Sequence, residues 1–263
     1  MMKDSQEIIA TTTFGPVAFQ QSGTGPAVVL LHGNGHSHHE FARVIPPLAE
    51  NHKVISWDMP GHGASRTAAA TLSIDESADA LSQGLAHLDI HDAVIVGTSI
   101  GAFIAAAFAA KTPSAARALV LAEMQLRTRA WWDKAWPIVE TMFGECVQTR
   151  DYVQARLESA LDDALLARWN GDRQLAGADA MIAAMAAIRD HPIATTLSRI
   201  TVPTLFLFGD SGPTVDCAET LGLALPGSSQ LIVPHAGHFI SIDQPQAFAQ
   251  AIETISAEQQ EGT

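Results

Sequence analysis

Short apolar runs alternate with amphipathic or alanine-rich stretches along most of this chain. The runs predicted as buried strands are 27–31, 53–57, 94–96, 119–121, 204–208 and 231–233. Residues 8–13 and 17–21 predict an antiparallel pair joined through Gly15 and Pro16. Stretches 40–50, 74–88, 102–110 and 245–255 predict helices, with Ser73 as the N-cap of the second. Strands that alternate with helices predict a mostly parallel sheet with right-handed crossovers.

The alternation of strands and helices stops at Glu123. From there to about residue 199 the pattern is helical only, and the segment is rich in Ala, Met and Trp. The strand pattern then resumes, so a helical insertion interrupts the sheet between two strands. We therefore predict an α/β core domain over residues 1–123 and 201–263, and an all-helical cap, or lid, over residues 124–200.

The composition fits one large domain of this kind, since 47% of the 263 residues are hydrophobic and 16% are charged. A net charge of −13 argues against a nucleic-acid partner and against an anionic membrane surface, because both would repel the chain. Cys146 and Cys217 are far apart and in no metal or redox spacing, so we expect free thiols and a cytoplasmic protein. The polar N-terminus lacks an apolar signal core, and no stretch is long enough to span a bilayer.

Residues 97–101 read Gly-Thr-Ser-Ile-Gly and stand between a predicted strand and a predicted helix. G-x-S-x-G in that context is typical of a nucleophile elbow, a tight turn that holds a serine hydroxyl above the end of a sheet. The two glycines allow the strand and the helix to pack closely. Ser99 is therefore the predicted nucleophile, and the backbone N–H of Ile100 is one predicted donor to an oxyanion.

A serine hydroxyl needs a general base, and the loop after the last predicted strand offers one. Residues 235–239 read His-Ala-Gly-His-Phe, and Asp243, Pro245 and a final helix follow. Together with the elbow, this run resembles the α/β-hydrolase family, which carries its catalytic histidine in a Gly-His loop before an acidic residue, a proline and a last helix. The resemblance implies the α/β-hydrolase fold. It selects His238 as the general base, with His235 as the lesser candidate.

Two further segments resemble the same family. Residues 32–35, His-Gly-Asn-Gly, resemble its His-Gly loop, which assigns the second oxyanion donor to the backbone N–H of Asn34. Residues 58–65 resemble its Asp-x-Pro-Gly-x-Gly-x-Ser turn, which is mainly architectural, so we assign Asp58 and His62 no chemistry. The resemblance covers the whole core and leaves only the insertion unmatched.

The acid of the triad is where this sequence departs from the family pattern. The family usually places it in Gly-x-x-Asp after the strand that follows the insertion, but that position here is Gly212. We favour Glu123, because it follows the strand next to that of the nucleophile, where catalytic groups gather in open parallel sheets. Some α/β-hydrolases, including the haloalkane dehalogenase branch, carry the acid there.

Other interpretations of these acidic residues stay open. Asp210 fits a neighbouring position that is often acidic for structural reasons, and Asp216 fits the N-cap of a following helix. Glu123 could instead be the first residue of the insertion, in an ion pair with Arg127 at helical spacing.

Two other clusters have rival interpretations. Three histidines near Glu40 suggest a metal site, namely His36, His38 and His39. Their spacing matches no standard ligand pattern, so we predict no metal there. A tryptophan cluster in the insertion fits helix-packing core, and in a lid it would also line an apolar substrate pocket: Trp131, Trp132 and Trp136.

These residues predict a serine hydrolase that needs no cofactor and acts on a small to medium carboxylic ester, a class that includes lactones and thioesters. Ser99 attacks, His238 transfers the proton, and Glu123 orients His238. Amide and carbon–carbon bond hydrolysis use a similar serine and histidine, and a non-catalytic ligand-binding protein on the same scaffold is the alternative from another class. The sequence indicates neither the substrate nor the oligomeric state.

Overall fold

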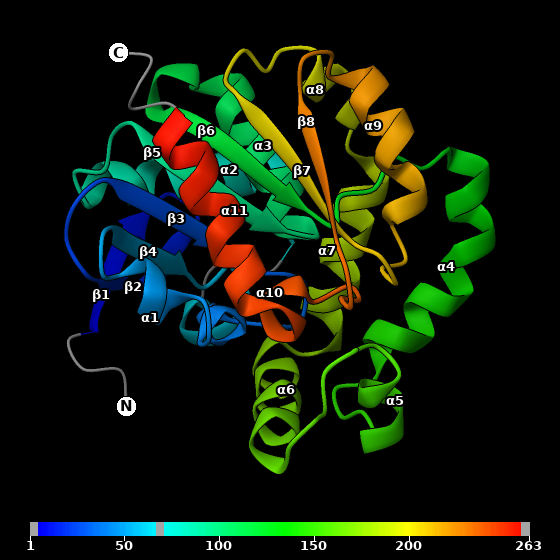
Figure 1. The fold of residues 1–263 in the computed structure, drawn as a ribbon. Helices are drawn as coiled ribbons and strands as arrows, with labels where there is room; N and C mark the ends of the chain where they lie inside the picture. The colour runs from blue at the N-terminus through cyan, green and yellow to red at the C-terminus, as the bar shows by residue number, and fades with distance from the viewer. Residues whose placement is uncertain (1–4, 67–70, 259–263) are drawn as a thin grey trace.

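An eight-stranded sheet is the centre of the computed structural model, which describes residues 5–66 and 71–258 (Figure 1). Its strand order is β1-β2-β4-β3-β5-β6-β7-β8. The strands are β1 (Gln6–Thr12), β2 (Gly15–Ser22), β3 (Ala27–Leu31), β4 (Lys53–Trp57), β5 (Ala93–Thr98), β6 (Ala116–Ala122), β7 (Thr204–Gly209) and β8 (Ser229–Val233). β2 pairs antiparallel with β1 and β4, and all the other neighbours pair parallel, which confirms the predicted mostly parallel sheet.

Helices cover both faces of the sheet. α1 (Ile45–Leu48) and α11 (Pro245–Glu258) lie on one face, and α2 (Ile74–His87) and α3 (Ile100–Lys111) lie on the other (Figure 1). α9 (Ala218–Ala224) packs against β7 and β8, and the short α10 (Ile240–Asp243) leads into α11. Ser73 is confirmed as the N-cap residue of α2. It forms a capping box with Glu76, in which each side chain accepts the backbone N–H of the other residue.

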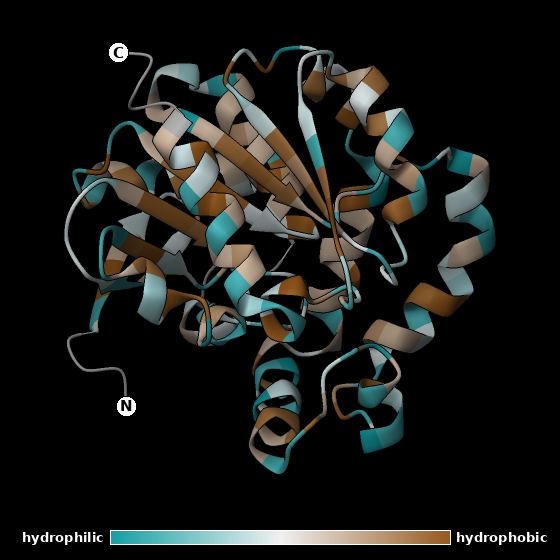
Figure 2. Cartoon of the chain, viewed as in Figure 1, coloured by the Kyte–Doolittle hydropathy of each residue, from teal (hydrophilic) through white to brown (hydrophobic). Residues whose placement is uncertain are grey.

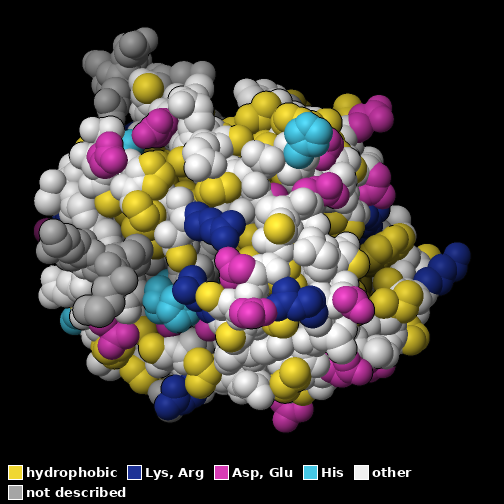
Figure 3. Space-filling model, turned by 60° about the horizontal axis from the view of Figure 1, so that its bottom comes forward, with side chains coloured by type: hydrophobic (Ala, Val, Ile, Leu, Met, Phe, Trp, Pro, Cys, Tyr) yellow, Lys and Arg dark blue, Asp and Glu magenta, His cyan; other side chains and the backbone are white. Residues whose placement is uncertain are grey.

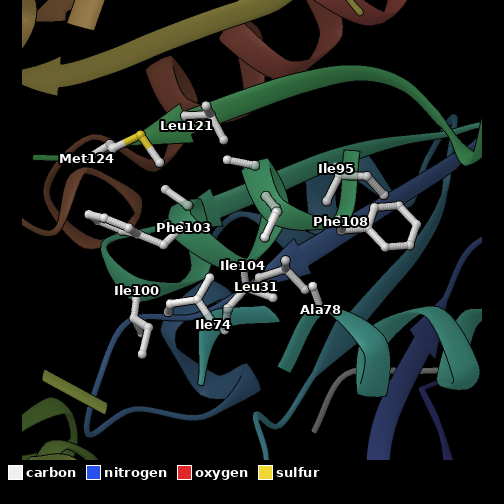
Figure 4. Packing of buried hydrophobic residues seen from close by; sticks show 14 of the residues in the cluster. Leu31, Ile74, Ala78, Ile95, Ile100, Phe103, Ile104, Phe108, Leu121 and Met124 are labelled. Carbon is white, nitrogen blue, oxygen red and sulfur yellow. The ribbon is translucent and has the colours of Figure 1, made fainter. Parts of the chain in front are cut away.

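Alternate strand residues enter two separate apolar clusters, one on each face of the sheet. In β3, Val28 faces the cluster under α11, whereas Val29 faces the cluster under α2 and α3. Because successive side chains of a strand point to opposite faces, strands buried on both faces must be apolar throughout. The central strands are accordingly the most hydrophobic part of the cartoon in Figure 2. Figure 4 shows the packing in the cluster on the α2 and α3 face, where Phe103, Ile104 and Phe108 of α3 pack against the sheet.

The stretch between β6 and β7 is helical, as the sequence predicts. It contains α4 (Arg129–Gly144), α5 (Arg150–Gln154), α6 (Asp163–Ala176), α7 (Ala178–Asp190) and α8 (Ile193–Leu197). α8 packs on α3, and α4, α5 and α6 extend to the right of and below the sheet in Figure 1. Within the described part of the chain, no helix is both long enough and apolar enough to cross a membrane.

One predicted helix, over residues 40–50, is wrong. The chain there forms a 3₁₀ turn, His38–Phe41, and then the four-residue α1. Pro46 and Pro47 are adjacent within the predicted span. Proline has no backbone N–H and clashes with the preceding turn, so the pair is tolerated only at the start of a helix, which is where α1 begins.

Candidate active site

The backbone turns sharply at Ser99, between β5 and α3. Ser99 has φ 54° and ψ −116°, a conformation that a residue with a side chain rarely adopts. A Cβ atom added at Gly97 would lie 2.2 Å from the carbonyl carbon of Gly101, and one at Gly101 would lie 2.2 Å from the carbonyl oxygen of Leu31. Only glycine fits at both positions. The serine side chain is therefore presented at the N-terminus of a buried helix by a strained turn.

The loop after β3 lies beside this turn. A Cβ atom on Gly33 would be 3.7 Å from Cβ of Ser99. The side chain of the next residue, Asn34, is fixed on two sides: its amide nitrogen donates to the carbonyl of Met181 at 2.8 Å, and its oxygen lies 3.1 Å from Nε2 of His62. Among the described residues, the backbone N–H groups of Asn34 and Ile100 have no hydrogen-bond partner. Two donors are thus left available beside Ser99.

The Glu40 carboxyl lies under this loop and is 4% exposed. It accepts the backbone N–H of Gly33 at 2.8 Å and the hydroxyl of Ser241 at 3.3 Å. Burial raises the pKa of Glu40 to about 7, and these hydrogen bonds offset only part of that shift. The sequence offers no signal for this role beyond an acidic residue near the loop.

The turn after β4 supports the loop from the other side. Asp58 accepts two backbone N–H groups, from His38 and Ala64, each at 2.8 Å, and Nδ1 of His38 lies 2.9 Å from the same carboxylate. Burial alone would raise the pKa of Asp58, but the hydrogen bonds and charge of His38 outweigh it and lower the pKa to about 2. Burial lowers the pKa of His62 to about 3, so His62 is neutral when it bonds to Asn34.

His238 and Glu123 meet at the carboxyl ends of the strands. Nδ1 of His238 lies 3.2 Å from Oε2 of Glu123. The Glu123 carboxylate is 1% exposed and also accepts the backbone N–H of Gly209 and the hydroxyl of Thr214, each at 2.7 Å. Glu123 itself follows β6 with φ 52°, and the backbone N–H of Ser99 donates to the preceding residue, Ala122, at 2.9 Å. The strand order therefore brings all three side chains to one edge of the sheet.

Gly212 is the position where the family usually carries its acid, and here it faces the Glu123 carboxylate. A Cβ atom on Gly212 would lie 2.5 Å from Oε1 and 2.7 Å from Oε2 of Glu123. The glutamate carboxyl group thus occupies the space that a side chain at 212 would need. Ser99 and His238 form no hydrogen bond with each other within the described structure. Such bonds often tighten only when substrate is bound.

The sequence matches the family described as the alpha/beta hydrolase fold over residues 26–245. The chain belongs to the α/β-hydrolase fold family. The structure agrees, since E-2-(acetamidomethylene)succinate hydrolase superimposes with a TM-score of 0.83 over 97% of this chain and 100% of that one, at 19% identity.

Two relatives match this α/β-hydrolase over most of its length, and a third matches it only in part. 3-Oxoadipate enol-lactonase 2 of Acinetobacter baylyi is 24% identical over 88% of each chain. A pimeloyl-[acyl-carrier protein] methyl ester esterase of Chromobacterium violaceum is 28% identical over 88% of this chain and 94% of that protein. The magnesium-chelatase 30 kDa subunit of Rhodobacter capsulatus is 39% identical, but over only 38% of this chain and 37% of that protein. With the family match, the first two identify the chain as a hydrolase.

The other predicted acids of this α/β-hydrolase lie elsewhere. Asp216 does not cap a helix: it lies within a 3₁₀ turn, α9 begins after Cys217, and both carboxylate oxygens accept from Arg127 at 2.7 Å. That ion pair also replaces the predicted one between Glu123 and Arg127. Asp210 is exposed and accepts the backbone N–H of Ala236 at 3.3 Å. Neither carboxylate is hydrogen-bonded to His238 in the described structure, and His235 is exposed.

The histidines considered for a metal have separate surroundings. His38 pairs with Asp58, His39 pairs with Asp172, and His36 packs edge-on against the ring of Trp169 at 4.5 Å. Across residues 5–66 and 71–258, no group of three or more metal-ligating side chains is placed to hold an ion.

The predicted pocket tryptophans lie on α4 with different exposures. Trp132 is 4% exposed within the main apolar cluster, whereas Trp131 is 39% exposed and lies under the guanidinium of Arg127. Trp136 lies under Arg189 and donates to Glu140 at 2.8 Å. Their part in a pocket stays a prediction.

A different tryptophan, Trp169 of α6, packs against Phe239, the residue after His238. Its ring is 4.7 Å from Phe239, and Phe239 is 5.0 Å from His238. It is 2% exposed, and its Nε1 donates to Gln148 at 2.9 Å. A single tryptophan in a mostly polar helix gave no signal in the sequence, because only the folding of the insertion over the core brings it here.

Proposed function

We propose that this protein is a serine hydrolase of small to medium carboxylic esters, a class that includes lactones and thioesters. Oγ of Ser99 bonds to the acyl carbon while its proton passes to Nε2 of His238. The backbone N–H groups of Asn34 and Ile100 hold the oxyanion of the tetrahedral intermediate. The intermediate then expels the alcohol, which takes the proton from His238, and water cleaves the acyl-enzyme by the same route in reverse. Glu123 keeps the Nδ1 proton of His238 in place.

The observation that carries this proposal is the contact of Glu123 with both His238 and the space beside Gly212. A serine and a histidine without an acid would favour a binding protein on a hydrolase scaffold. Here a buried carboxylate with two further hydrogen bonds lies 3.2 Å from Nδ1 of His238. That arrangement fixes the tautomer in which Nε2 is free to accept the serine proton.

The relatives favour an ester bond over an amide or carbon–carbon bond. The lactonase and the esterase described above, which each match over 88% of this chain, are named for an enol-lactone and a methyl ester. Both bonds are carboxylic esters, and their cleavage requires only the groups described above. The size of the acyl and alcohol parts is the finer question, and esters and lactones of graded chain length would measure it.

A serine-directed fluorophosphonate tests the nucleophile. We expect rapid labelling of the wild-type protein at Ser99, loss of labelling in Ser99→Ala, and loss of ester hydrolysis in the same variant. Ser198→Ala is a suitable matched control, because Ser198 is exposed at the end of α8 and its hydroxyl donates only to the carbonyl of Thr195 in the described structure. Full esterase activity in pure Ser99→Ala protein would refute the mechanism.

A further inference from the structure

Two arginines of the helical insertion, one buried and one half-buried, have no ion-pair partner among the described residues. Arg173 of α6 is 1% exposed and Arg156, which follows α5, is half-buried. Neither forms an ion pair within the described residues, whereas Arg117 and Arg127 each pair with an aspartate at the surface. On the face shown in Figure 3, Lys and Arg side chains likewise lie close to Asp and Glu side chains. Buried charges are ordinarily paired, because removing a cation from water is costly.

Arg173 is held by neutral groups only. Its Nη2 donates to the carbonyls of Met142 and Glu145, each at 2.7 Å, and its buried Nε has no partner in the described structure. Burial, with the nearby charge of Arg156, lowers the pKa of Arg173 to about 10. The side chain therefore stays cationic at neutral pH. Its acidic sequence neighbour, Asp172, instead accepts from Ser37 at 2.8 Å.

Arg156 has few polar contacts, of which the side chain of Tyr152 is one. Its Nη1 lies 3.3 Å from the sulfur of Met142, and its guanidinium carbon lies 5.4 Å from the ring centre of Phe239 and 5.9 Å from that of Trp169. Burial lowers its pKa. Thioether and aromatic groups attract a cation only weakly compared with a carboxylate. Donor capacity on a planar guanidinium is left unused.

Both arginines lie beside segments that carry residues of the candidate site, and the guanidinium of Arg156 packs over Phe239, the residue after His238. A Cβ atom on Gly35, the residue after Asn34, would be 3.1 Å from Nη1 of Arg173. A Cβ atom on Gly237, the residue before His238, would be 2.9 Å from the carbonyl oxygen of Arg156. The charges of both arginines also act on His36, whose pKa is lowered well below its usual value by burial and then by the charges of His32, Arg173, Arg156 and His238. The charge of Glu145 acts on Arg173, but no ion pair joins the two side chains in the described structure.

From this we propose that Arg156 and Arg173 bind an anionic group of the substrate, so that the preferred ester carries a free carboxylate or a similar oxyanion. The inference rests on the proposed ester hydrolysis and names its substrate class. A guanidinium donates two parallel hydrogen bonds to a carboxylate, and a desolvated site strengthens them. The substrate anion completes the pairing that the protein itself leaves open.

The test compares matched esters. Monomethyl glutarate carries a free carboxylate, and the monomethyl ester of glutaric acid monoamide has the same length without the charge. We expect kcat/KM of the wild-type enzyme to be about 10- to 100-fold higher for the acid, the worth of one or two hydrogen bonds to a charged group. Arg156→Gln should lower kcat/KM for the acid much more than for the amide, and so remove most of this preference. Arg156→Lys should retain part of it.

Arg150→Gln is the matched control, because Arg150 is an exposed arginine of the same insertion that pairs with Asp163. It should leave the preference unchanged. Competitive inhibition by glutarate and by inorganic phosphate distinguishes a carboxylate subsite from a phosphate subsite. Equal kcat/KM values for the acid and the amide, with unchanged inhibition in Arg156→Gln, would overturn the proposal.

Failure of the subsite and failure of the proposed hydrolysis give different results. If 4-nitrophenyl acetate is cleaved in a Ser99-dependent manner but the anionic ester is not preferred, only the subsite is wrong. If no ester is cleaved, calorimetric binding of glutarate that weakens about tenfold or more in Arg156→Gln still supports the subsite. Absence of both cleavage and binding would refute the two proposals together.

Discussion

Replacing Gly212 with alanine should push a methyl group into the Glu123 carboxylate. The added Cβ would lie 2.5 Å from Oε1, 2.7 Å from Oε2 and 2.9 Å from Cδ of Glu123. The carboxylate has little freedom to move, because Gly209, Thr214 and His238 hold it. Accommodating the methyl therefore requires breaking or stretching these hydrogen bonds. We expect a loss of both stability and turnover.

The magnitude follows from two effects of opposite sign. Overpacking of this kind costs about 1–3 kcal/mol of unfolding free energy. In a Glu123→Ala background the methyl meets no carboxylate, and the alanine then stabilises by about 0.4–1 kcal/mol because it restricts the unfolded chain. The difference predicts a coupling energy of roughly 1.4–4 kcal/mol between positions 123 and 212.

Urea unfolding of the wild type, Gly212→Ala, Glu123→Ala and the double variant measures that coupling at one pH. Equal slopes of free energy against urea concentration would show that the four proteins unfold comparably. The turnover of Gly212→Ala on one ester is measured in parallel. Additive stability changes, within about 0.5 kcal/mol, would mean that the carboxylate does not fill the space beside Gly212, and the reasoning would fail.

Three further predictions concern the acids of the site. Asp210→Asn and Asp216→Asn should leave kcat within about threefold of the wild type, whereas Glu123→Gln should lower it by about 10²- to 10⁴-fold; a dominant loss at either aspartate would move the acid there. Glu123→Ala combined with Gly212→Asp places a carboxylate in the same space, but from the loop after the neighbouring strand. The double variant should recover part of the kcat that Glu123→Ala loses. A kcat no higher than that of Glu123→Ala would contradict this prediction. Burial raises the pKa of Glu40 from 4.5 to about 7, so between these pH values the folded protein binds a proton that the unfolded chain has lost. The unfolding free energy should therefore fall as pH rises from about 4.5 to 7, by up to roughly 3 kcal/mol. Urea unfolding at pH 5 and pH 8 measures this fall, which should be smaller by that amount in Glu40→Gln. An equal fall in the wild type and in Glu40→Gln would argue against the raised pKa.

Local pattern was enough to predict most of the sheet. The runs at 27–31 and 53–57 coincide with β3 and β4, because a strand buried on both faces needs an unbroken apolar sequence. The helix expected at 40–50 does not form over that whole span, because Pro46 and Pro47 lack backbone N–H groups and fit only in the first turn of the short α1. The elbow is also local, since Gly97 and Gly101 lie two residues either side of Ser99.

The sequence by itself determined the family, the fold and the strained turn at Ser99, because each depends on residues close together in the chain. Only the tertiary structure decided which acidic residue meets His238, since Glu123 is 115 positions away and reaches it through the order of β5, β6, β7 and β8. It likewise decided that the buried Arg173 and the half-buried Arg156 have no ion-pair partner among the described residues. Burial and charge pairing are sums over neighbours from distant segments, and spacing along the chain does not encode those neighbours.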